Sequence, residues 1–129
     1  MTSLWDTNRV THLVRQILQS HHPDPTYGTG RPFLTTYQLA IEFSDQFPQV
    51  AAILAQQTGG EGHGPYALTT YLARWLPDRI RHRGVTDIEL RFLAPIHIAG
   101  IQLQSGQSII STTTDQAGFN TTMFRYIGP

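Results

Sequence analysis

The chain contains no cysteine and no lysine. Without cysteine it can form neither disulfide bonds nor thiolate metal sites, and cysteine nucleophiles are excluded. Without lysine, all nine of its basic side chains are arginines. Arginine makes bidentate contacts with carboxylate and phosphate and is easier to desolvate than lysine, so these positions suit buried or interfacial contacts. A general compositional preference for arginine is the alternative explanation.

Long apolar runs are absent as well. No stretch approaches the roughly 18 apolar residues of a membrane span, and the N-terminal segment, with Asp6 early, lacks the apolar core of a signal peptide. We therefore expect no membrane partner and a cytoplasmic location. A length of 129 residues is typical of one domain, so we expect a single domain over residues 1–129.

Charge is scarce and balanced. Charged residues make up 14% of the chain, and the formal net charge is zero. A domain that holds nucleic acid through bulk electrostatics is usually basic, so the overall charge argues against that role. A sparsely charged surface does leave room for a protein partner or for self-association.

The first part of the chain has helical patterns. In residues 10–18 the apolar side chains recur at the i, i+3, i+4, i+7 spacing of an amphipathic helix, which we expect to begin near Ser3 or Asp6. Three prolines and two glycines predict a loop over residues 21–32.

Cap residues and prolines divide the rest of this part. Thr35 and Gln38 have the spacing of a capping box, which predicts the start of a second helix. Pro48 ends that helix or opens the next one, which is alanine-rich. After a glycine-rich loop, Pro65 suits the first turn of another helix, which Pro77 must kink or divide.

After Gly84 the apolar period changes from that of a helix to that of a strand. In residues 88–92 apolar and charged side chains alternate, as in a strand with one solvent-exposed face. Further strands are expected on either side of a tight turn at Ser105 and Gly106, and over residues 119–127.

We therefore predict an α+β fold, with three to four helices in residues 1–84 and an antiparallel sheet of three or more strands in residues 85–129. This order of elements also fits a winged-helix variant. Residues 35–47 would then form the positioning helix, residues 65–75 the recognition helix, and the hairpin around residues 105–106 the wing. The candidate nucleic-acid-binding residues are Tyr66, Thr69, Thr70, Arg74, Arg79, Arg81 and Arg83.

Two other interpretations of the arginine cluster stay open. Residues 74–83 contain four arginines and one acid, Asp78, but the helix macrodipole favours cations in a last turn whatever their function. The arginines could also pair with another chain.

The link from Pro48 to Pro65 is longer than the turn of about three or four residues in a helix-turn-helix, which weakens the winged-helix hypothesis.

The glycine-rich loop of residues 59–64 carries Glu61 and His63. Its amides could hold an anion at a helix N-terminus, and His63 could transfer protons. However, the Lys-Ser/Thr ending of a phosphate loop is missing, and no partner stands at a fixed spacing. A flexible surface loop is the favoured interpretation, and a gating loop or a binding lip is the functional alternative.

No metal site and no cofactor are predicted. His21, His22 and Asp24 could bind an ion together with His63 or His97, but adjacent histidines in a proline-rich loop are awkward ligands, and no helical metal-binding spacing occurs. His97 lies between two isoleucines, so we expect it to face solvent from a strand.

The favoured function is a small binding domain without enzymatic activity, of winged-helix type, that binds nucleic acid or acts in regulation. The alternative is a protein–protein or assembly module, or a homo-oligomer, which works through the low-charge surface and an uncharged edge strand in residues 105–122. A more distant alternative is a small hydrolase or metal enzyme centred on His63.

Overall fold

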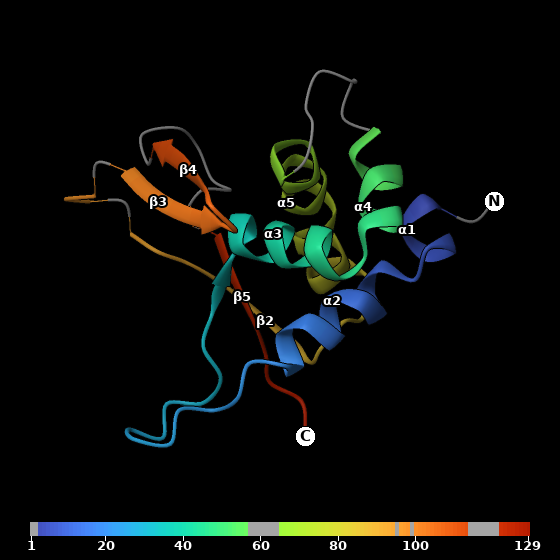
Figure 1. Cartoon of the computed structure of the whole chain (residues 1–129). Coiled ribbons are helices and arrows are strands. Elements are labelled where there is room, and N and C mark those ends of the chain that lie inside the picture. Colours follow the sequence, from blue (N-terminus) through green and yellow to red (C-terminus); the bar gives the residue numbers. More distant parts are fainter. Residues whose placement is uncertain (1–2, 57–64, 95, 99, 114–121) are drawn as a thin grey trace.

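The computed structural model describes residues 3–56, 65–94, 96–98, 100–113 and 122–129. Its fold is α+β, as predicted (Figure 1). Helices occupy the first part of the chain, and all strands but one occupy the last part. Within the described residues, no helix is both long enough and apolar enough to cross a membrane.

The N-terminal helical segment begins where predicted but is interrupted. α1 (Leu4–Thr7) starts after Ser3, whose hydroxyl accepts a hydrogen bond from the Asp6 amide at 3.1 Å. α2 (Val10–Gln19) follows and buries the predicted apolar stripe. Between them Arg9 has a φ of 54°. This left-handed conformation cannot continue a right-handed helix, so the prediction of one continuous helix is wrong at this point.

The predicted capping box is present at the start of α3 (Thr36–Gln46). The Gln38 amide donates to Thr35 Oγ1 at 3.2 Å, and the Thr35 amide donates to Gln38 Oε1 at 2.8 Å. α4 (Pro48–Ala55) begins directly at Pro48, whose fixed φ and missing N–H suit a first helical position.

α5 (Pro65–His82) continues through Pro77. The proline does not divide the helix, so of the two predicted alternatives the kink stays a prediction. Leu76, just before the proline, is fully buried, and Ile80, three residues after it, is partly buried against the core. Burial of apolar side chains on both sides of Pro77 outweighs the single backbone hydrogen bond that the proline removes.

Three strands form an antiparallel sheet in the order β1-β5-β2. They are β1 (Leu34–Thr35), β2 (Ile88–Phe92) and β5 (Thr122–Tyr126), with Leu34 opposite Phe124. β2 and β5 fall where strands are predicted. β1 is not predicted, because its two residues lead directly into α3 and only their pairing with β5 makes them a strand.

β3 (Gly100–Ser105) and β4 (Ser108–Thr113) form a separate hairpin, inserted between β2 and β5. The predicted tight turn is confirmed, since Ser105 pairs with Ser108 across it. Gly106 takes a φ of +61° there, which glycine adopts without steric cost. β3 contacts α3, and Figure 1 shows the hairpin beside that helix.

One hydrophobic core joins the helices to the sheet. β5 is the central strand, and its side chains Phe124 and Tyr126 are buried in this core. The buried members of the core are Trp5, Val10, Val14, Ile17, Leu18, Leu34, Leu39, Ala40, Phe43, Ala51, Leu54, Leu68, Tyr71, Leu72, Leu76, Ile88, Phe124 and Tyr126.

Two arginines tie α2 to later segments of the chain. Arg15 makes a two-point contact with Asp87, at 2.5 Å from Nε to Oδ2 and 3.0 Å from Nη2 to Oδ1. The hydrogen bond with this carboxylate raises the pKa of Arg15. Arg31 donates to the Gln19 carbonyl at the end of α2, at 2.7 Å. Both contacts use the forked geometry of the guanidinium group, which a lysine side chain lacks. They fit the expectation that these arginines serve buried or interfacial contacts.

A third arginine fastens the loop of residues 21–33 to the sheet. Arg125 on β5 pairs with Glu89 at 3.1 Å and donates to the Thr29 carbonyl at 2.9 Å. Its guanidinium also lies 4.5 Å from the centre of the Phe33 ring. The predicted loop is therefore confirmed, and side-chain contacts hold it against β5.

Candidate nucleic-acid interface

α5 presents one stripe of polar side chains to solvent. Thr70, Arg74 and Arg81 are all exposed. Thr70 and Arg74 are one helical turn apart and Arg81 follows two turns later, so the three side chains lie on the same side of the helix. Arg81 forms no ion pair with any residue that the structure describes. The side chain of Tyr66, which the sequence places on the same stripe, lies outside the described part.

Thr69 does not belong to this stripe. It was expected on the solvent face of α5, but its exposed fraction is 0%. One residue along a helix is a rotation of about 100°, which turns Thr69 away from Thr70 and towards the interior. The burial of Thr69 could have been predicted from the sequence, because Thr69, Leu72 and Leu76 have the i, i+3, i+7 spacing of a buried helix face.

Arg79 is an anchor between α5 and α1. Its side chain is only 11% exposed, and its Nη2 donates to Ser3 Oγ at 3.1 Å. Its Nη1 lies 3.7 Å from the Asp6 carboxylate, and its guanidinium lies 5.6 Å from the centre of the Trp5 ring. These contacts engage both Nη atoms of Arg79 within the fold and separate its side chain from the exposed stripe of α5.

Arg83 forms an exposed ion pair. Its Nε lies 3.7 Å from Asp78 Oδ2, and its side chain is 62% exposed. An exposed pair of this kind contributes little to stability, because water and salt screen the attraction. Arg83 is therefore accessible, but the Asp78 carboxylate offsets part of its positive charge. Arg74 and Arg81 are accessible and have no such carboxylate beside them among the described residues.

The hairpin β3–β4 also carries exposed neutral polar side chains, which were not among the predicted site residues. Gln102, Gln104 and Gln107 are exposed. Gln104 Nε2 donates to the Gly106 carbonyl at 3.1 Å, which orders one of these amides near the turn. Glutamine amides can donate to phosphate oxygens and can bond to base edges. The alternation of Gln102 and Gln104 with apolar residues could have identified this face of β3 in the sequence.

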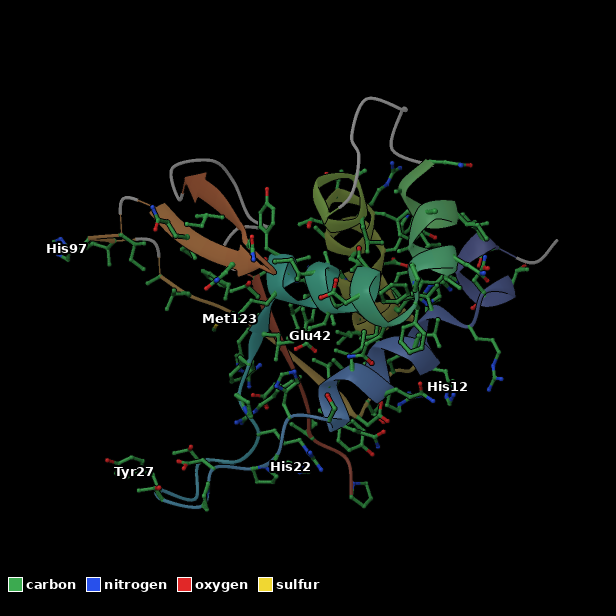
Figure 2. The ribbon with its side chains drawn as sticks, viewed as in Figure 1. His12, His22, Tyr27, Glu42, His97 and Met123 are labelled. Carbon is green, nitrogen blue, oxygen red and sulfur yellow. The ribbon has the colours of Figure 1, made fainter. Side chains whose placement is uncertain are left out.

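The histidines do not form a metal site in the part of the chain that the structure describes. There, no three histidine or carboxylate side chains gather closely enough to hold an ion. Figure 2 shows His12, His22 and His97 at three separate places on the molecule. His21, which precedes His22 in the chain, has its Nε2 2.9 Å from the Glu42 carboxylate.

Two sequence predictions concern the loops. His97 is exposed, as predicted, but it lies in a turn with a φ of +65° and not in a strand. A positive φ is incompatible with an extended strand, so that part of the prediction is wrong. The predicted role of the loop with Glu61 and His63 lies outside the described residues.

Comparisons of the chain with protein-family models, with curated proteins and with solved structures found no match. The geometry of the chain itself is therefore the basis for its proposed function.

Proposed function

We propose that this chain is a winged-helix-like domain that binds nucleic acid. The sheet order carries the proposal: β1-β5-β2, with α3 and α5 between β1 and β2 along the chain, and a hairpin between β2 and β5. A winged helix has a strand after its first helix, two helices next, and a wing between the last two strands of a three-stranded sheet. α2, α3 and α5 correspond to its three helices. The argument is one of architecture, and the chemistry of the surface has to support it.

The long link between α3 and α5 is compatible with this architecture. α4 occupies the link and packs against both helices, while α3 and α5 remain in direct contact with each other. The insertion therefore lengthens the corner of the helix-turn-helix without separating its two helices. In such a pair the second helix enters the major groove, which assigns that position to α5.

The exposed side chains supply the required chemistry. Arg74 and Arg81 on α5 can contact phosphates, and Thr70 can donate to a phosphate or to a base edge. The glutamines of the hairpin can donate to phosphate oxygens, as the side chains of a wing would. Because the net charge of the chain is zero, we expect binding through a few local contacts and not through a general positive field.

The test is the salt dependence of binding to a short DNA duplex, measured by fluorescence anisotropy. Each phosphate contact contributes about −0.9 to the slope of log K against log salt, so two arginine contacts predict a slope of about −2 or steeper. Single-stranded DNA and RNA of the same length serve as comparison ligands. The absence of salt-dependent association with all three ligands would contradict the proposal.

A protein-interaction module is the second candidate, and exposed apolar side chains favour it. Phe92 is 73% exposed, and Ile96 and Ile109 are each 68% exposed. All three lie in the strand part of the chain, and exposed apolar side chains mark a protein contact where they form a contiguous patch. If they bind a second copy, light scattering will show a dimer that Phe92→Ser converts to monomer. A monomer at all concentrations, with no effect of Phe92→Ser, would exclude self-association.

A further inference from the structure

A cleft of about 160 Å³ lies between α1 and α5. It is separate from the hairpin and lies beside the exposed stripe of α5, with which it shares Arg74. Its lining is aromatic and cationic: Ser3, Leu4, Trp5, Tyr71, Arg74, Trp75 and Arg79.

The aromatic side chains form consecutive walls. The Trp5 and Tyr71 rings are stacked, with 5.9 Å between their centres and 23° between their planes. The Tyr71 and Trp75 rings follow at 6.4 Å with an angle of 48°. Trp5 is 2% and Tyr71 5% exposed, so only a small part of each ring reaches the cleft, whereas Trp75 is half-buried and more accessible.

The polar side chains make this cleft positive. None of the described residues that line it is acidic. Burial raises the pKa of Tyr71 above its ordinary value near 10, so its phenol adds no negative charge at neutral pH. Asp6, outside the lining, partly neutralises Arg79 at 3.7 Å. Arg74 lies over the Trp75 ring, at 5.2 Å from its centre, and no described carboxylate pairs with it.

Arg79 also has capacity for another acceptor. Its Nε is buried and has no hydrogen-bond partner among the described residues. A buried guanidinium N–H without an acceptor is costly, and an anionic oxygen is the acceptor that compensates it best. Two guanidinium groups beside aromatic rings therefore suit a ligand that is both planar and negatively charged.

We propose that this cleft binds a small aromatic carboxylate with a single ring. The volume supports one ring, because a cavity of roughly 150 Å³ accommodates benzene. The ring would lie against Trp75 and the accessible parts of Trp5 and Tyr71, and the carboxylate would face Arg74 and Arg79. This site would make the domain responsive to a small molecule, whatever macromolecule it also binds.

The two tryptophans give a direct measurement, because both tryptophans of the chain line the cleft. In a nitrogen-15 NMR spectrum their indole N–H groups give two side-chain signals, which Trp5→Phe and Trp75→Phe assign. We expect sodium benzoate to shift both signals in a saturable way, with a dissociation constant on the order of 1 mM. Benzamide, which is neutral, and cyclohexanecarboxylate, which is not planar, should each bind about tenfold more weakly.

A pair of matched variants tests the role of the cation. Arg74→Gln should weaken benzoate binding about tenfold, because it removes a charge-assisted contact. Arg81→Gln removes the same charge from the same helix outside the cleft and should leave binding unchanged. Both arginines are exposed, so neither variant should impair folding.

Three results would overturn the proposal. They are the absence of saturable shifts with benzoate, equal binding of benzamide and benzoate, and equal loss of binding in the two variants. The titration contains no nucleic acid, so failure of nucleic-acid binding does not affect its outcome.

Discussion

Replacing Arg74 and Arg81 together by alanine is expected to weaken duplex DNA binding roughly ten- to a hundredfold near 0.1 M salt, since two phosphate contacts are lost. The slope of log K against log salt should become shallower by about 2. The folded state should be almost unaffected, because both side chains are exposed. Fluorescence anisotropy across a salt series measures both quantities, and circular dichroism verifies the fold.

The control is a second double variant with the same change in charge. Arg83→Ala with Arg91→Ala removes two arginines that are 62% and 64% exposed and that each lie near an acid, Asp78 and Glu89. We expect this variant to bind DNA within about threefold of the native chain, because each arginine lies beside an acid and neither makes a proposed contact with DNA. Equal weakening in both double variants would show that net charge, and not the stripe on α5, controls binding.

The largest effect on stability is expected from Phe124→Ala, which should lower the free energy of unfolding by about 3–5 kcal/mol. Phe124 is fully buried on the central strand β5 and stands opposite Leu34 on one side and Leu90 on the other. Removing its ring leaves a cavity at the point where all three strands meet. Because small domains have total stabilities of about 5–15 kcal/mol, the variant should be close to unfolding.

Urea denaturation followed by circular dichroism gives this free energy. Phe92→Ala is the matched control, since Phe92 lies on the neighbouring strand β2 and is 73% exposed. Its loss should be below about 0.5 kcal/mol. A loss below about 1 kcal/mol for Phe124→Ala would contradict the packing of β5 at the centre of the sheet.

The helix starts could be predicted because neighbouring residues decide them. Thr35 and Gln38 satisfy each other's backbone amides across a single turn, and Pro48 has its φ set by its own ring. The stripe of α2 and the tight turn at Gly106 are equally local patterns. For these elements a pattern of a few residues already contains the interactions that form them.

The candidate site was only partly predictable. The sequence correctly placed the exposed residues Thr70, Arg74 and Arg81 on α5. It could not distinguish them from Arg79, because the contacts that bury Arg79 come from Ser3 and Asp6, more than seventy residues earlier in the chain. A cluster of arginines looks uniform in sequence, although one member serves the fold and others face solvent.

The sequence by itself determined an α+β order of elements and the first residues of α3 and α4. It also excluded disulfide bonds, thiolate metal sites and any role for a lysine side chain. Only the tertiary structure decided that Leu34 and Thr35 form a strand, since β1 exists through its pairing with β5 at the other end of the chain. It likewise decided that α1 and α5 enclose an aromatic, cationic cleft. The physical reason is the same in both cases: the groups that meet are far apart along the chain, and only packing of the common core brings them within contact distance.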